Sequence, residues 1–229
     1  MRPPNTEGEP TAKCLIFVTP DAQRSMNTFL GASTELRPSD ISKDFIGRSK
    51  ILYLEGYLWD PPNAKKAFLE AINIAKAADT KVALSLSDAF CVDRYRSEFL
   101  DLVRTHVDIL FGNETELLSL YQVENLNEAI GLVQDDCEIV AVTRDSRGSI
   151  VIENRRVFEI AAQKIDTVID TTGAGDLYAS GFLYGITRDM DIRQCGKLGG
   201  LVASSIITQF GARPEESLMP LIDRVAVPN

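Results

Sequence analysis

Short apolar segments alternate with longer amphipathic segments along most of the chain. The short segments are typical of strands buried on both faces of a sheet, and they predict strands at 51–54, 82–86, 107–111 and 139–143. The segments between them predict helices at 62–78, 93–103 and 127–133. Strands that alternate with helices of this length pair in parallel. The sequence therefore predicts an α/β fold with a mainly parallel central sheet and helices on both faces.

The remaining segments predict two hairpins and two further helices. Residues 14–18 and 25–29 form the first predicted hairpin, around a turn at 20–23, and residues 148–152 and 157–160 form the second. The last third predicts helices at 173–185 and 192–209. Both are rich in small residues and suited to close packing. Because residues 198–207 are apolar on nearly every side, we expect them to lie in a buried helix.

Length and composition indicate one globular domain. The 229 residues are 45% hydrophobic and 25% charged, which is enough for one substantial core. We expect a single domain at 13–229 after a disordered lead-in at 1–12, which is rich in Pro, Gly and charge. The net charge of −9 argues against nucleic acid or an anionic membrane as a partner.

Other features of the composition favour a cytoplasmic location and argue against a metal centre built from histidine and cysteine. No apolar stretch approaches the roughly 20 residues that span a bilayer, and the first residues lack a signal peptide's apolar region. Four cysteines are scattered singly and His106 is the only histidine. We therefore expect free thiols, a structural His106, and neither zinc nor histidine-based catalysis.

The segment from Asp170 to Asp176 reads Asp-Thr-Thr-Gly-Ala-Gly-Asp and carries the most chemistry. Gly173, Ala174 and Gly175, here called the anion cradle, have almost no side chain, so their amides can approach an anion at the start of the following helix. A carboxylate beside bound phosphate repels it, so Asp176 indicates a second role, general-base catalysis of phosphoryl transfer. The alternative is a helix start in which Asp176 only complements the dipole.

Three motifs occur in the order found in a known family. The segment 170–176, followed by the small-residue helix entry at 179–182, resembles the signature of the ribokinase/PfkB family of small-molecule kinases. Upstream, 113–116 resembles the family's Asn-x-x-Glu element, and 142–148 resembles its Thr-x-Gly-x-x-Gly nucleotide turn. The resemblance runs from about residue 14 to about 214. The segments 18–21, 24–28 and 55–62 look most like bacterial adenosine-kinase-like members.

This resemblance implies a ribokinase-like α/β fold and a role for each matching residue. Asp176 would be the catalytic base and the anion cradle would hold the transferring phosphoryl group. The other implied ligands are Thr143 and Gly148 for the nucleotide, Arg24 for its phosphates, Asn113 and Glu116 for Mg²⁺ through water, and Asp170 and Thr172 for a monovalent cation such as K⁺. Two alternatives stay open: Asn113 and Glu116 also match a capping box, and Arg24 also fits a solvated hairpin arginine.

The implied activity is ATP-dependent, Mg²⁺-dependent phosphorylation of a hydroxyl group on adenosine or a related ribose-containing acceptor. A sugar kinase of the same family and an inactive nucleotide-binding fragment are the alternatives. A Rossmann dinucleotide domain is excluded, because Gly173-Ala174-Gly175 lies late in the chain without Gly-x-Gly-x-x-Gly. The expected partner is a small-molecule acceptor, and a homodimer is left open.

The chain departs from the family pattern in two respects. Asp145 stands where the nucleotide turn normally has glycine; aspartate can adopt a positive φ, but its charge is expected to weaken nucleotide binding. Family members also carry an N-terminal portion before the region that resembles residue 14. We therefore expect the first strand, a Gly-Gly acceptor segment and part of the lid to be missing.

Overall fold

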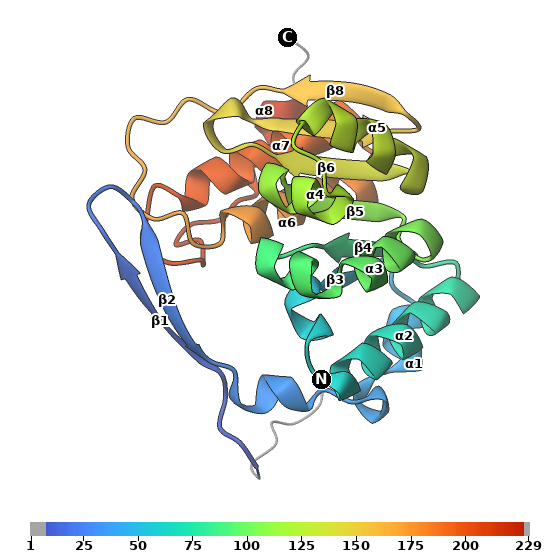
Figure 1. Cartoon of the computed structure of the whole chain (residues 1–229). Helices are drawn as coiled ribbons and strands as arrows, with labels where there is room; N and C mark the ends of the chain where they lie inside the picture. The colour runs from blue at the N-terminus through green and yellow to red at the C-terminus, as the bar shows by residue number, and fades with distance from the viewer. Residues whose placement is uncertain (1–7, 227–229) are drawn as a thin grey trace.

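The computed structural model describes residues 8–226 and contains a central six-stranded sheet (Figure 1). The strand order is β3-β4-β5-β6-β7-β8. The first four strands pair in parallel, whereas β7 and β8 are antiparallel. Their bounds are β3 (Ile51–Glu55), β4 (Lys81–Ser85), β5 (Ile109–Asn113), β6 (Ile139–Thr143), β7 (Ser149–Glu153) and β8 (Arg156–Ile160). The carboxyl ends of four neighbouring strands thus meet at one edge of the sheet.

Helices cover both faces of the sheet, as the sequence predicted. One face packs against α2 (Pro62–Ala77), α3 (Ala89–Thr105), α4 (Glu114–Tyr121) and α5 (Leu126–Asp136). The other face packs against α6 (Ala174–Thr187) and α7 (Ile192–Ile206), and α8 (Pro220–Ala226) lies on α7. The predicted three-layer α/β fold with a mainly parallel sheet is confirmed. The apolar segment 198–207 contributes several buried side chains, namely Leu198, Leu201, Val202 and Ile206.

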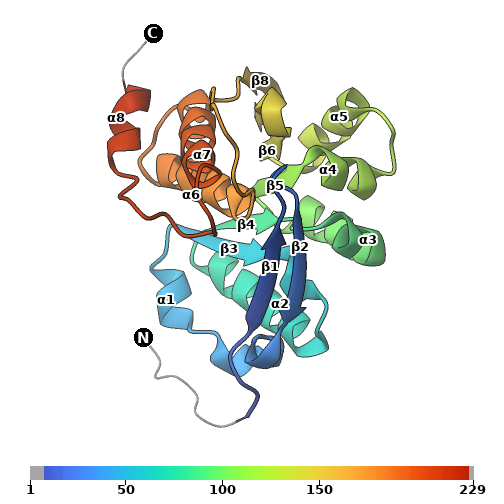
Figure 2. The same ribbon diagram turned by 90° about the vertical axis from the view of Figure 1, so that its left-hand side faces the viewer.

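A separate two-stranded sheet stands beside the main body (Figures 1 and 2). It is formed by β1 (Lys13–Val18) and β2 (Arg24–Phe29), which matches the first predicted hairpin. Short helices connect it to β3, and their bounds are η1 (Gly31–Glu35), η2 (Pro38–Asp40) and α1 (Lys43–Gly47). Of the expected lead-in, residues 8–12 are exposed and form no helix or strand, and residues 1–7 lie outside the described residues.

Several element boundaries differ from the predictions for local reasons. Helix α3 begins four residues earlier than predicted, because the Asp88 side chain caps it by accepting a hydrogen bond from the Phe90 amide at 2.7 Å. Strand β5 extends to Asn113, two residues beyond its predicted end. Helix α7 ends at Ile206 rather than at Gln209. The short helices α1 and α8 had no strong apolar pattern and were missed.

His106 and the cysteines take structural positions. His106 ends α3 and donates its backbone amide to the Leu102 carbonyl at 2.8 Å. Burial lowers the pKa of its imidazole. The four cysteines are free; Cys137 and Cys195 are buried, and Cys14 is exposed. Across residues 8–226, we find no helix that is both long and apolar enough to cross a membrane.

Candidate active site

The anion cradle lies at the start of α6, where the backbone turns sharply. Gly173 is the N-cap residue with φ of 82°, a conformation that suits glycine. A Cβ atom at Gly173 would lie 2.7 Å from the Cβ of Ala212, so the loop after α7 leaves no room for a side chain. Within residues 8–226, the amides of Gly175 and Asp176 find no hydrogen-bond partner. Of the cradle amides, that of Ala174 donates to the Thr171 carbonyl at 3.3 Å. This helix start therefore presents the Gly175 and Asp176 amides as free donors, as an anion requires.

Asp176 lies in the first turn of α6 and is exposed. Burial raises the pKa values of Tyr53 and Tyr57, which lie in and just after β3, and the negative charge of Asp176 makes a small further contribution. Although much of Tyr57 is exposed, its surroundings raise the pKa of its hydroxyl to about 12. Partial burial has the largest effect, followed by the charges of Asp88, Glu116, Glu55 and Asp176. We call these four acidic residues the carboxylate cluster.

Glu55 and Asp88 were not among the predicted site residues, and neither was Tyr57. Glu55 ends β3 and accepts a hydrogen bond from the Ser87 hydroxyl at 2.7 Å. Ser87 has φ of 68°, which few side chains favour outside special turns. The signal in the sequence was the position of these polar residues directly after predicted strands. This signal does not identify a site by itself, because the sequence does not show that β3 and β4 are neighbours in the sheet.

Asn113 and Glu116 form a reciprocal capping box at the start of α4. The Asn113 side chain accepts from the Glu116 amide at 2.8 Å, while the Glu116 carboxylate accepts from the Asn113 amide at 2.9 Å and from its Nδ2 at 2.8 Å. Burial raises the pKa of Glu116 to about 7, aided by the charges of Asp88 and Glu55 and opposed by the Asn113 hydrogen bond. The capping alternative is thus present in the structure, and it leaves the Asn113 side chain exposed at the sheet edge.

Asp170 and Thr172 are buried just before the cradle. Asp170 accepts hydrogen bonds from the amide and hydroxyl of Thr172, at 2.9 and 2.6 Å, and from the Gly211 amide at 2.9 Å. Burial alone would raise the pKa of Asp170, but these hydrogen bonds and the charge of Arg24 hold it below its ordinary value. Asp170 therefore fastens the cradle segment to the loop that also contacts Gly173.

The predicted nucleotide turn, residues 143–148, connects β6 to β7. Thr143 pairs in register with Asn113 on one side and with Ser149 on the other. Asp145 has φ of 50°, so it adopts the positive φ anticipated for an aspartate at this glycine position. Gly148 has φ of 82°, and a Cβ there would lie 2.0 Å from the Ile160 carbonyl oxygen. The conformation of the turn therefore requires glycine at position 148.

Two side-chain contacts join distant segments to the cradle. The Tyr178 hydroxyl of α6 hydrogen-bonds the Ser149 hydroxyl at 2.8 Å, which holds the first turns of α6 over the nucleotide turn. Arg24 of β2 donates from Nη1 to the Thr171 hydroxyl. Arg24 is exposed but reaches the segment before the cradle, so the hairpin contacts the body there. The capping box and the nucleotide turn thus follow the neighbouring strands β5 and β6, and the Tyr178–Ser149 hydrogen bond holds the helix that begins at the cradle next to them.

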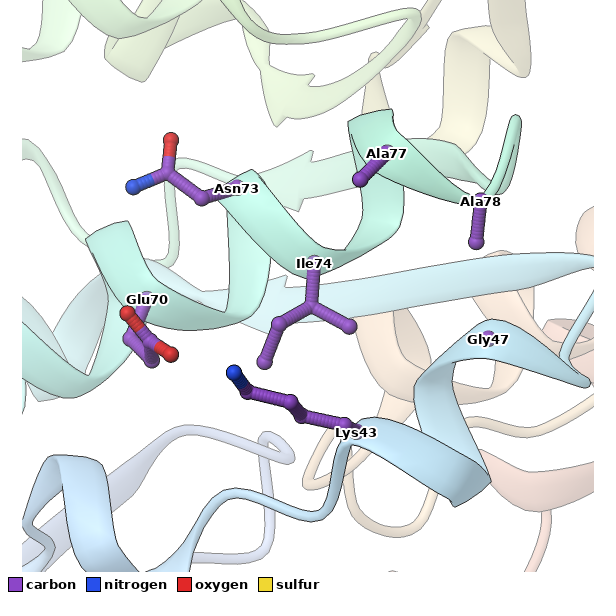
Figure 3. A pocket seen from close by; sticks show the side chains of 7 residues that line it. All are labelled: Lys43, Gly47, Glu70, Asn73, Ile74, Ala77 and Ala78. Atoms are coloured by element: carbon purple, nitrogen blue, oxygen red, sulfur yellow. The ribbon is translucent and has the colours of Figure 1, made fainter.

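A surface pocket of about 390 Å³ lies elsewhere, between α1 and α2. Figure 3 shows Lys43 of α1 extending toward Glu70 and Ile74 of α2. The other lining residues are Gly47, Asn73, Ala77 and Ala78. None of these residues belongs to the predicted site.

Comparisons with a family model and with solved structures both relate this chain to small-molecule kinases. A model of the pfkB family carbohydrate kinases matches residues 4–218. The fold is similar to that of adenosine kinase from Sinorhizobium meliloti, with 49% identity, a TM-score of 0.92 and coverage of 96% of this chain and 68% of that one. It is also similar to a probable sugar kinase from Rhizobium etli CFN 42, with 50% identity, a TM-score of 0.91 and coverage of 94% and 66%.

Among curated relatives, 5-dehydro-2-deoxygluconokinase from Listeria monocytogenes is 29% identical over 201 residues. The match covers 85% of this chain and 61% of that protein. The chain thus spans about two thirds or less of the length of such relatives.

Proposed function

Because the chain belongs to the pfkB family of carbohydrate kinases, we propose that it transfers the terminal phosphoryl group of ATP to a hydroxyl group of a nucleoside or sugar. Adenosine is the first acceptor to test. The observation that carries this proposal is the position of Asp176 in the first turn of α6, where, among residues 8–226, its own amide and that of Gly175 have no hydrogen-bond partner.

The arrangement supports attack by a hydroxyl group. Asp176 would take the proton of the acceptor hydroxyl while its oxygen forms a bond to the terminal phosphorus and the bond from that phosphorus to ADP breaks. General-base catalysis contributes roughly 10²–10⁴-fold. The cradle amides would stabilise the charge on the transferring group, and one such preorganised donor is worth about 3 kcal/mol in measured cases. The two features together can provide a large share of a kinase's rate enhancement.

A putative ribokinase II from E. coli with a similar fold is in complex with ATP and Mg²⁺, and the residues present in this chain fit a hydrated ion. Within residues 8–226, no three His, Cys, Asp or Glu side chains are placed to hold a metal directly. Mg²⁺ usually keeps several waters and meets one or two protein oxygens, so Asn113 and Glu116 would hold it through water. Bound Mg²⁺ would supply positive charge against the phosphates. Asp170 and Thr172 remain the proposed site for a monovalent cation such as K⁺.

Two acceptor classes have support. The S. meliloti relative is described as an adenosine kinase, and the exposed ring of Tyr57, two residues after the end of β3, offers a face for a nucleoside base. The R. etli relative is described as a probable sugar kinase and the Listeria relative as a 5-dehydro-2-deoxygluconokinase, so a sugar is the second candidate. An inactive nucleotide-binding protein is the third, because much of the relatives' length has no counterpart in this chain.

The test is ATP consumption by the purified chain with Mg²⁺, against adenosine and a panel of sugars. Asp176→Asn should abolish most turnover while ATP binding stays normal or becomes tighter. Asp223→Asn is the matched control, since Asp223 is also an exposed aspartate in the first turn of a helix, and it should leave turnover unchanged. A folded chain that binds ATP and turns over none of the acceptors would favour the inactive alternative. Unchanged turnover in Asp176→Asn would remove Asp176 from the role of base.

A further inference from the structure

An ion pair connects the nucleotide turn to the capping box. Arg147, the last residue of the short helix η4 (Asp145–Arg147), donates from Nη2 to the carboxylate of Glu114, the first residue of α4. The side chains are 61% and 25% exposed, respectively. Glu114 directly follows Asn113, which pairs in register with Thr143. The ion pair thus lies between the residues predicted to bind the nucleotide and the residues predicted to bind Mg²⁺.

The second arginine of the turn is engaged differently. The Arg144 side chain is only 13% exposed, and its Nη2 lies 3.4 Å from the Arg147 carbonyl oxygen and 3.5 Å from Glu159 Oε2. Arg144 is therefore packed along the turn. Among the described residues, Arg147 has Glu114 as its only ionic partner, so Arg147 is the exposed cation that the turn can present to a ligand.

Resting on the proposed kinase function, we infer that Arg147 binds a phosphate of ATP and that Glu114 holds the guanidinium in place until the nucleotide arrives. A guanidinium fork fits phosphate as well as carboxylate, and a triphosphate carries more negative charge. An exposed ion pair typically changes an equilibrium by only about 1.4- to 5-fold. Replacing Glu114 by a phosphate as the partner of Arg147 therefore costs little free energy. Glu114 keeps a favourable place at the start of α4 after Arg147 leaves, because a helix start stabilises a carboxylate.

The Arg147–Glu114 pair also bears on how a nucleotide could bind next to the negative charge of Asp145. The turn carries two arginines and Asp145, but Arg144 lies 3.5 Å from Glu159 and Arg147 pairs with Glu114. While both pairs hold, neither arginine is free to offset the charge of Asp145. Release of Arg147 when the nucleotide binds would supply one positive charge against that aspartate, so the turn could accept phosphate despite it.

A purely structural ion pair makes a different prediction for Glu114. If the pair only joined the turn to α4, removing either partner would weaken both the fold and nucleotide binding. If Glu114 competes with phosphate for Arg147, the two substitutions have opposite effects on ATP affinity.

The experiment is a direct titration of ATP with Mg²⁺ at low salt, by calorimetry, on the wild-type chain, Arg147→Ala and Glu114→Gln. Arg147→Ala should weaken ATP binding by roughly 10- to 100-fold, the range for a hydrogen bond to a charged group. Glu114→Gln should tighten it by about 2- to 5-fold. Adenosine titrated alone should bind equally well to the wild type and both variants, because it has no phosphate.

The control uses a matched ion pair at the opposite end of the same strands. Arg155, in the turn between β7 and β8, pairs with Asp135 near the end of α5. Arg155→Ala should leave ATP affinity unchanged, and melting curves should show that all variants are folded.

Several outcomes would overturn the inference. Wild-type affinity in Arg147→Ala would remove the phosphate contact, and weaker ATP binding in Glu114→Gln would show that the pair is structural. If the wild-type chain turns ATP over but Arg147→Ala binds normally, only this inference fails. If the wild-type chain does not bind ATP at all, the proposed function fails with it.

Discussion

The two glycines of the anion cradle can be tested separately, because their surroundings differ. Gly173 has φ of 82°, and a Cβ there would lie 2.7 Å from Ala212 Cβ and 3.0 Å from its Cα. Gly175 lies in the first turn of α6, and a Cβ there would meet no atom within 4 Å. Alanine at position 173 would therefore place its methyl group against Ala212, whereas alanine at position 175 would place the same group in open space.

The expected changes in stability follow from these distances. In Gly173→Ala, the left-handed backbone costs roughly 1–2 kcal/mol and the overlap with Ala212 about 1–3 kcal/mol. The free energy of unfolding should fall by about 2–5 kcal/mol. In Gly175→Ala, a helical glycine is replaced without overlap, so the free energy of unfolding should stay level or rise by roughly 0.5–1 kcal/mol.

The expected change in activity is different, because the proposed phosphoryl group would occupy the space beside Gly175. If a phosphoryl group approaches the Gly175 amide closely, the new methyl group displaces it. A misplacement of about 1 Å can cost on the order of 10²-fold in rate. Gly175→Ala should therefore lose turnover while keeping its stability. No effect on the fold would account for such a loss.

Urea denaturation gives the stability of both variants, and ATP consumption with the best acceptor gives their activity. Full turnover in Gly175→Ala would refute close approach of a phosphate at this position. Wild-type stability in Gly173→Ala would refute the argument from packing, since the loop at Ala212 would then move at little cost.

Two further predictions concern charge. Glu116 has its pKa raised from 4.5 to about 7, so the folded chain holds this proton more tightly than the unfolded chain does. The free energy of unfolding should therefore fall by on the order of 3 kcal/mol as the pH rises through that range. Glu116→Gln, which can keep the capping box, should flatten this fall in melting temperature between about pH 5 and pH 7.5; equal slopes would contradict it. Asp145→Gly removes a charge where φ is 50° and should tighten ATP binding with little change in stability; weaker or equal affinity would show that Asp145 does not repel the nucleotide.

The elements of the sheet could be predicted because each strand and helix carries its own local pattern. All eight strands had a counterpart in the sequence, and the capping residue Asn113 stands directly at the start of α4. The short helices α1 and α8 could not be predicted, since five and seven residues give too few turns for a periodic pattern. Their stability comes from tertiary packing.

The site was predictable only in part. The cradle, the Asn-x-x-Glu element and the nucleotide turn are contiguous motifs, so the sequence shows them, although the roles of their residues stay predictions. The carboxylate cluster is different, because Glu55 and Asp88 approach Glu116 only through the order of β3, β4 and β5. The contact of Arg24 with Thr171 spans 147 positions, a distance over which no local pattern carries information.

The charges at the sheet edge explain why a kinase built on this site would need cations at the moment of binding. Four carboxylates influence Tyr57, close to where a triphosphate would lie. Like charges 4 Å apart repel by roughly 4 kcal/mol near a protein surface. In the proposed complex the cradle amides, Arg24 and Arg147 would oppose this repulsion, but Arg147 pairs with Glu114 in the structure and would first have to leave that pair. The nucleotide should therefore bind mainly as its Mg²⁺ complex, and its affinity should depend more steeply on Mg²⁺ than on any single arginine.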